Sequence, residues 1–271
     1  MRRINWGFRL AGALMIMLLA GCGAQTAGGP EPSSTPLPPD RLVFLVEATG
    51  GFVPALNAAL QSPALAVYGD GRVIQYDQKK KERDVPAAYT VAQVDPLLVA
   101  QFAAETEALN LIQEGTDFGE PPVSDMPTTT VQLNGSAGPR EVQVYAFADS
   151  FDKDVSADQR KARRDLGAVI DRAHGLPGDA EQAPYRPDTV RVVELEDTEF
   201  AEMAPAWPGP APNSFLSSTQ TYFSCGTLSG AAAEKAYAAA RRNPGAVWTA
   251  EGTELTLAVT ALLPGTVGCP A

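Results

Sequence analysis

Two tight-turn signals, each followed by a helix-start signal, constrain the fold of this 271-residue chain more than any other feature. The first is Gly-Asp-Gly at 69–71 and the second is Asn-Gly at 134–135. Each lies between two short runs of β-branched, aromatic and other apolar residues. Because these turn residues tolerate the positive φ that tight hairpins need, both segments are predicted to be antiparallel hairpins. The four strands are expected at 65–68, 72–76, 128–133 and 141–147.

A helix is predicted after each hairpin. Asp95 followed by Pro96 is typical of a helix N-terminus, and Ser156 with Gln159 has the pattern of a capping box. Apolar residues recur at helical spacing in both segments, and Gly175 ends the second one. The expected buried positions are Leu98, Phe102, Leu109 and Ile112 in the first helix, and Ala162, Leu166, Val169, Ile170 and Ala173 in the second.

Further strands are predicted at 42–47 and 189–195, one before and one after these units. The alternation of antiparallel hairpins with helices predicts an α+β sheet-and-helix sandwich over residues 41–197. Residues 198–218 form a proline-rich connector that cannot enter the interior of a sheet. Residues 219–271 are predicted to form a small C-terminal α/β unit, in which an alanine-rich helix precedes a last hairpin.

The N-terminal segment has the features of a bacterial export signal. Residues 1–21 carry three arginines and no acid, with an apolar run that is too short to span a bilayer comfortably. The run leads into Leu-Ala-Gly-Cys at 19–22, which resembles the lipobox of bacterial lipoproteins. This resemblance implies that Cys22 receives diacylglycerol and palmitate and becomes the first residue of the mature chain. The chain would then be anchored to the outer, extracytoplasmic face of the cell membrane. Two or more acyl chains anchor a protein stably, whereas one acyl chain gives only marginal membrane binding.

The residues after the lipidated cysteine, 23–40, are small, polar and rich in proline. A segment of this composition buries too little apolar surface to fold, so 22–40 is predicted to be a disordered tether. A coil of this length spans about 20–30 Å, which would keep the folded part near the membrane without laying it on the surface.

The charge balance disfavours nucleic acid as a partner. Removal of 1–21 takes away three of the 21 basic residues and none of the 32 acidic ones, which leaves a net charge of −14. A chain with this charge repels phosphate backbones and anionic headgroups. The expected partners are the membrane, through the lipid anchor alone, and an envelope protein or glycan.

Two cysteines remain beside Cys22, and both lie in the C-terminal unit. In an exported and oxidising setting, Cys225 and Cys269 are predicted to form a disulfide. Closing a loop of this length stabilises a fold by about 4 kcal/mol in the chain-entropy model. The alternative is a reactive or metal-binding pair, but neither cysteine has a histidine or a third thiol beside it in the sequence.

The sequence shows no catalytic constellation. His174, the single histidine, lies at the predicted end of a helix, where a cation favours the helix dipole. The chain has no nucleophile elbow, no Walker loop and no dinucleotide fingerprint, and it lacks the ligands that zinc prefers. We therefore expect no enzymatic activity, no cofactor and no metal.

An acidic loop before the second helix leaves a calcium site open as an alternative. It contains Asp149, Asp152, Asp154 and Asp158. The spacing departs from the helix-loop-helix calcium loop, because Ala157 replaces the required glycine and Arg163 replaces the twelfth-position glutamate. A solvated loop that caps the helix is favoured, and the basic residues 160–164 are expected on the solvated side of that helix.

A second acidic loop carries Asp117, Glu120 and Asp125. Paired carboxylates at such a place could serve a glycosidase. Carboxylates are common in polar loops, so this interpretation is the alternative rather than the leading one.

Two aromatic residues in loops are candidate binding anchors. Phe52 follows a Gly-Gly turn and Trp207 lies in the proline-rich connector. Exposed aromatic side chains of this kind often anchor a partner, although each could equally fold back onto the core.

Several blocks of the body resemble a group of exported lipoproteins of high-GC Gram-positive bacteria that has no established activity. The blocks are 49–54, 68–74, 125–130 and 144–145, followed by 225–230, Trp248, 262–264 and Cys269. The resemblance covers most of the chain after the tether. It implies export and a shared architecture, and it implies no chemistry.

Together these features predict a non-catalytic binding or interaction module that a lipid anchor tethers to the outer face of the membrane. The alternative is a carboxylate-dependent hydrolase that acts on cell-envelope polysaccharide.

Overall fold

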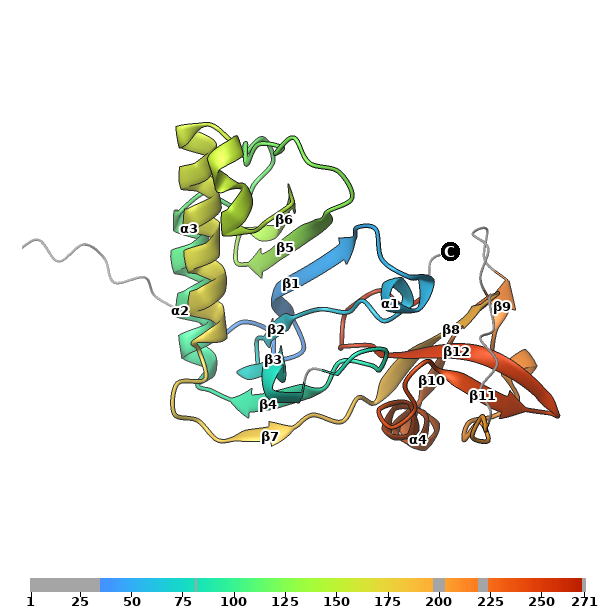
Figure 1. The fold of residues 1–271 in the computed structure, drawn as a ribbon. Helices are drawn as coiled ribbons and strands as arrows, with labels where there is room; N and C mark the ends of the chain where they lie inside the picture. The colour runs from blue at the N-terminus through green and yellow to red at the C-terminus, as the bar shows by residue number, and fades with distance from the viewer. Residues whose placement is uncertain (1–34, 81, 197–202, 219–223, 270–271) are drawn as a thin grey trace, which may run out of the picture. The chain divides into compact units, whose positions relative to one another are not determined.

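Seven antiparallel strands form the first sheet, in the order β6-β5-β1-β2-β3-β4-β7 (Figure 1). The computed structural model describes residues 35–80, 82–196, 203–218 and 224–269. The strands of this sheet are β1 (Leu42–Gly50), β2 (Leu65–Tyr68), β3 (Arg72–Tyr76), β4 (Tyr89–Gln93), β5 (Pro127–Gly135), β6 (Gly138–Tyr145) and β7 (Gln182–Pro184). Both predicted hairpins are present, and β1 lies between them because it pairs with β2 on one side and β5 on the other.

The turn of the second hairpin lies two residues later than the Asn-Gly signal predicts. Asn134 and Gly135 extend β5, and Ser136 with Ala137 forms the loop before Gly138. The carboxylate of Glu107 accepts hydrogen bonds from Ser136 Oγ and from the Ala137 amide, each 2.9 Å long. The contact with Glu107, a residue distant in sequence, therefore sets the position of this turn, and the local Asn-Gly signal does not.

Two long helices cover one face of the first sheet and lie side by side (Figure 1). They are α2 (Pro96–Ala108) and α3 (Ala157–His174). Both predicted N-caps form: the Asp95 side chain accepts from the Leu97 amide, and Ser156 with Gln159 makes a capping box. The prediction of which residues are buried on the first helix is partly wrong. Residues 98 and 109 are exposed, and the buried face is instead Val99, Ala100, Phe102, Ala103 and Thr106.

A second antiparallel sheet has the order β11-β12-β8-β10-β9. Its strands are β8 (Thr189–Leu195), β9 (Ser217–Ser218), β10 (Ser224–Ser229), β11 (Val247–Ala250) and β12 (Thr253–Ala261). Helix α4 (Gly230–Ala240) packs on one face of this sheet, around the buried Trp248. The same core includes Leu45, Tyr68 and Ile74 of the first sheet, so apolar side chains join the two sheets.

Strand β8 lies in the second sheet, between β12 and β10, although the sequence analysis grouped it with residues 41–197. Both faces of this strand are covered. Val190 and Val192 face the core that contains α4, while Val193 and Leu195 pack in a separate cluster on the opposite face. Apolar residues on both faces suit a strand whose two faces are both covered, and this pattern does not tell which sheet the strand joins.

The disulfide between Cys225 and Cys269 is present, with the two Cα atoms 5.7 Å apart. Two antiparallel sheets, the helices and this disulfide confirm the α+β class. The described residues all belong to one compact unit. In the described part of the chain, no helix has the length and apolar character that crossing a membrane requires.

The short elements lie in the loops between the strands and helices of the two sheets. Helix α1 (Ala55–Ala59) follows β1. The 3-10 turns are η1 (Gln78–Lys80), η2 (Asp149–Asp154) and η3 (Pro212–Ser214). The proline-rich connector runs beside β11, where the Trp207 amide donates to Thr249 O and the Thr249 amide donates to Pro205 O, each at 2.9 Å.

The last residues of the expected tether contact the fold. Leu37 packs against the core under α2 and α3. The carbonyls of Pro38 and Pro39 accept hydrogen bonds from the amides of Arg41 and Asp70. The ordered body therefore includes residues 35–40, which composition alone assigned to the tether.

Candidate functional site

A pocket of about 380 Å³ lies at the junction of the two sheets. We call it the junction pocket. Its walls come from β1, the segment after α1, β5, β8, β12 and the C-terminal tail. The lining residues are Leu45, Glu47, Gln61, Ser62, Pro63, Gln132, Arg191, Thr260, Ala261, Leu262, Gly265, Thr266, Val267 and Gly268.

Strand geometry explains why β1 contributes Leu45 and Glu47 to this pocket. Successive side chains of a strand alternate between its two faces. Phe44 and Val46 therefore point to the core under the helices, whereas Leu45 and Glu47 point the other way. Gln132 of β5 pairs with Leu45 across the ladder and shares that face.

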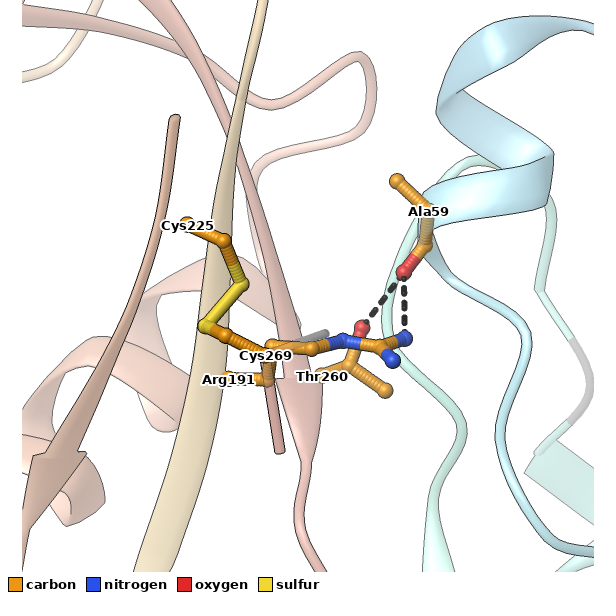
Figure 2. Close-up of a disulfide and its surroundings, with 5 residues drawn as sticks. All are labelled: Ala59, Arg191, Cys225, Thr260 and Cys269. Atoms are coloured by element: carbon orange, nitrogen blue, oxygen red, sulfur yellow. Dashed lines mark hydrogen bonds between the residues drawn. A yellow bond between two sulfur atoms is a disulfide. The ribbon is translucent and has the colours of Figure 1, made fainter. Parts of the chain in front are cut away.

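Arg191 lines the pocket from β8 and is held by backbone carbonyls, of which Figure 2 shows that of Ala59. Its Nη2 donates to Ala59 O and to Gln61 O, each at 3.2 Å. Thr260, the partner of Arg191 on β12, donates through Oγ1 to the same Ala59 carbonyl at 2.9 Å. These bonds attach the end of α1 to the second sheet and fix the position of the guanidinium.

Arg191 and Glu47 attract one another without a direct ion pair among the described residues. Burial lowers the pKa of Arg191, and the negative charge of Glu47 raises it in part. Burial raises the pKa of Glu47, and the positive charge of Arg191 lowers it in part. Nε of Arg191 is buried without a hydrogen-bond partner in this part of the chain. A buried polar atom of this kind is uncommon in proteins and points to a functional position.

The disulfide holds the wall of the junction pocket that the C-terminal tail provides. Cys269 directly follows the lining residues 265–268, and its bond to Cys225 attaches the tail to β10. Further back along the tail, Tyr68 Oη donates to Pro264 O at 2.9 Å. The tail is therefore attached at both ends of the segment that lines the pocket.

A second hollow, of about 640 Å³, contains two of the three acids expected in one loop. Asp117 and Glu120 line it, together with Gln143, Tyr145 and Gln159. Asp117 accepts hydrogen bonds from Gln159 Nε2 and from a backbone amide, and these bonds lower the pKa of its carboxyl group. We call this the acidic hollow.

The third acid of that loop, Asp125, is not among the lining residues of the acidic hollow. It has a positive φ of 61°, and its carbonyl accepts a hydrogen bond from the Phe52 amide. Its backbone therefore holds the loop that follows β1.

The two aromatic candidates lie in different environments. Phe52 is 88% exposed, at the loop between β1 and α1. Trp207 is only 9% exposed; its ring packs edge-on against Trp248 at 5.3 Å, and its Nε1 donates to Pro210 O. Trp207 belongs to the core in this structure, so Phe52 alone remains an exposed aromatic candidate.

Cys22, the expected lipid site, lies outside the described residues.

The loop before α3 has a structural role that the sequence analysis did not assign. Arg163 was expected on a solvated face but is 1% exposed. Its Nε lies 2.8 Å from the carboxylate of Asp152, and its other nitrogens donate to the carbonyls of Phe118, Tyr145 and Ala146. The buried side chain thus joins α3 to the end of β6 and to the loop that contains Phe118.

His174 is the last residue of α3, and its Nδ1 lies 3.2 Å from Gln75 Oε1. Burial lowers its pKa. Within the described ranges, no group of three or more histidine, cysteine, aspartate or glutamate side chains is arranged to hold a metal ion.

Sequence reasoning missed both charged residues of the junction pocket. Glu47 is the last residue of the strand predicted at 42–47, and Arg191 lies within the strand predicted at 189–195. The available signal was an ionisable residue within each of two strongly apolar runs, since such residues are seldom buried without a partner.

Comparisons with family models, with curated proteins and with solved structures find no match to this chain.

Proposed function

We propose that this chain is a membrane-anchored lipoprotein of the cell envelope whose folded part binds a small ligand in the junction pocket without catalysing a reaction. The observation that carries the proposal is the pair of opposite charges in that pocket. Glu47 and Arg191 are partly buried, come from different sheets and make no direct ion pair with one another among the described residues. A concave site that holds a few polar groups in fixed positions is the usual form of a small-molecule site.

The anchoring part of the proposal rests on the sequence. Residues 1–21 have the features of an export signal, and Cys22 stands where a lipobox has its lipidated cysteine. Lipid on this residue would place the pocket on the extracytoplasmic side. A ligand from the cell wall or the surrounding medium could then reach it directly.

The lining of the pocket favours binding over catalysis. Arg191 is held by two backbone carbonyls, so the guanidinium is positioned before a ligand arrives. Ser62, the one serine of the lining, accepts a hydrogen bond from Tyr89 Oη at 2.7 Å, and no histidine lines the pocket to activate it. Activation of a hydroxyl nucleophile requires an adjacent base.

A matched pair of tryptophan substitutions tests where the protein binds. Gln132→Trp fills the junction pocket from β5, and Gln143→Trp places the same ring on β6 at the acidic hollow. We expect ligand-observed NMR with a library of small polar fragments to give hits that Gln132→Trp removes and Gln143→Trp retains. Hits that survive Gln132→Trp, or a library that gives no hit, would contradict binding in the junction pocket.

The second candidate function is a carboxylate-dependent hydrolase, and the acidic hollow is the observation that favours it. Asp117 and Glu120 line one hollow, and hydrogen bonds hold Asp117 ionised. This candidate predicts release of reducing sugar from purified cell-wall polysaccharide. Asp117→Asn and Glu120→Gln should each abolish that release, while Asp125→Asn should leave it unchanged.

A further inference from the structure

Within the described ranges, the charges that Glu47 and Arg191 bring to the junction pocket have no direct partner of opposite charge. Among the described residues, neither the Glu47 carboxylate nor Nη1 of Arg191 makes a hydrogen bond. The other terminal nitrogen of Arg191 contacts neutral carbonyls, which satisfy hydrogen bonds but do not neutralise the charge. Partly buried charges of this kind are stabilised by a ligand that brings the opposite charge.

We propose that the junction pocket takes a small zwitterion, with its acid group on Arg191 and its amine on Glu47. This inference rests on the proposed binding function and names the ligand class. An amino acid, or a compound of similar size with one carboxylate and one ammonium group, has this chemistry. Both charged groups of the pocket would then have an opposite charge in direct contact.

A ligand with one charge fits the pocket less well. A simple carboxylate on Arg191 would add a second negative charge near Glu47, and a simple amine on Glu47 would add a second positive charge near Arg191. Like charges at short range oppose binding. A zwitterion avoids both repulsions because each end faces the opposite charge.

The charge of the whole protein supports the same class of ligand. The mature chain expected from the sequence carries 18 basic and 32 acidic residues. This excess of negative charge repels anions as they approach, whereas a zwitterion has no net charge and is not repelled. The cavity of about 380 Å³ is large enough for a molecule of amino-acid size.

Three other polar side chains of the lining are already hydrogen-bonded within the protein. Gln61 bonds the backbone of Gly50 through both its amide nitrogen and its oxygen. Thr260 and Thr266 each donate to a backbone carbonyl. Recognition in this pocket therefore depends mainly on Glu47 and Arg191.

Titration calorimetry of the purified lipoprotein in detergent tests the inference with matched probes. The zwitterions are glycine, β-alanine, γ-aminobutyrate and 5-aminovalerate, which separate the two charges by increasing lengths. Propionate lacks the amine of β-alanine, and ethylamine lacks its acid. We expect the best zwitterion to bind at least about tenfold more tightly than propionate or ethylamine at neutral pH, which corresponds to about 1.4 kcal/mol.

The variants assign each end of the ligand. Glu47→Gln should reduce zwitterion affinity to that of propionate, and Arg191→Gln should reduce it to that of ethylamine. Asp117→Asn, at the acidic hollow, should leave the affinity unchanged. Circular dichroism spectra of all three variants should match the spectrum of the unmodified protein, so that a lost fold is not mistaken for a lost site.

Two results would overturn the inference. If propionate binds as tightly as every zwitterion and Glu47→Gln has no effect, the pocket is an anion site; the proposed binding function then stands and the ligand class is wrong. If no zwitterion binds at millimolar concentration, the ligand class is also wrong. The fragment experiment with Gln132→Trp then decides separately whether the proposed binding function survives.

Discussion

Arg191 donates a hydrogen bond of 3.2 Å to the carbonyl of Ala59, a residue 132 positions earlier in the chain. Ala59 ends α1, which follows β1 of the first sheet, whereas Arg191 lies in β8 of the second. One guanidinium therefore joins segments that are distant in sequence and also supplies the positive charge of the junction pocket. The stability of the fold and the proposed ligand binding therefore involve the same side chain.

Arg191→Met should destabilise the fold because the carbonyls of Ala59 and Gln61 lose a charged donor. The Ala59 carbonyl then keeps only its hydrogen bond from the Thr260 hydroxyl. Hydrogen bonds to charged groups contribute about 1.5–3 kcal/mol each, and part of this is offset because Met leaves no buried charge behind. We expect a loss of about 1–3 kcal/mol in the free energy of unfolding, measured with urea. Arg186→Met is the control; Arg186 is exposed and pairs with Glu234, so its change should stay within about 0.5 kcal/mol. Equal effects of the two substitutions would contradict this role of Arg191.

Removal of the disulfide should loosen the C-terminal tail before the rest of the chain. The bond joins residues 44 positions apart, and in the chain-entropy model its loss costs about 4 kcal/mol. Hydrogen exchange of the double variant Cys225→Ser/Cys269→Ser should show early loss of protection in β10 and at 262–268. A uniform loss of protection across the chain would show one cooperative domain instead, without a separable C-terminal unit.

Arg163→Met should be more destabilising than most substitutions of charged residues. It removes the partner of Asp152 and the donor that Arg163 supplies to three carbonyls, of which Ala146 O keeps a hydrogen bond from the Ala148 amide. Breaking a buried ion pair from one side costs about 3–5 kcal/mol. The control is Arg164→Met, since Arg164 is the exposed neighbour on α3 and its replacement should change the unfolding free energy by less than about 0.5 kcal/mol. A small effect of Arg163→Met would mean that the loop carbonyls find other donors.

The α+β class could be predicted because its signals are local. The capping box of Ser156 and Gln159 involves residues three positions apart, and it forms as predicted. The turn at 69–71 also connects two paired strands as predicted. Each of these features depends on backbone preferences that hold in many tertiary contexts.

The junction pocket could not be predicted because its parts meet only through tertiary contacts. In sequence, Arg191 is a polar residue between valines, which is the pattern of a strand with one solvated face. In the structure that face is covered by the end of α1. Arg163 was misassigned for a related reason: helical periodicity shows which side chains share a face, but it does not show that a loop covers that face.

The expected lipid anchor makes a prediction about Cys22. Cys22→Ser should abolish incorporation of labelled fatty acid and release the protein from the membrane fraction, because the lipobox interpretation makes this thiol the attachment point for the lipid. Processing of the unmodified chain should be sensitive to globomycin. Normal labelling of the Cys22→Ser protein would contradict the lipobox interpretation.

The raised pKa of Glu47 predicts how stability and binding respond to pH. Burial raises this pKa in the folded chain, so between the ordinary value near 4.5 and the raised value the folded state holds a proton more tightly than the unfolded state. The contribution of Glu47 to stability is therefore fully present below the ordinary value and is lost as pH rises through the raised one. Glutamine does not ionise, so the Glu47→Gln variant does not lose stability in this way as pH rises. We expect the variant to gain stability relative to the unmodified protein as pH increases from 4 to 7, measured by urea unfolding at each pH.

Binding of a zwitterion should show the opposite dependence on pH. The ammonium group of the ligand favours the ionised form of Glu47, so the affinity should be full above the raised pKa and should decrease as pH falls through it. The Glu47→Gln protein should bind β-alanine with an affinity that does not change over the same range. Calorimetric titrations at pH 4, 5, 6 and 7 measure both proteins. An affinity of the unmodified protein that stays constant across this range would show that Glu47 does not contact the amine.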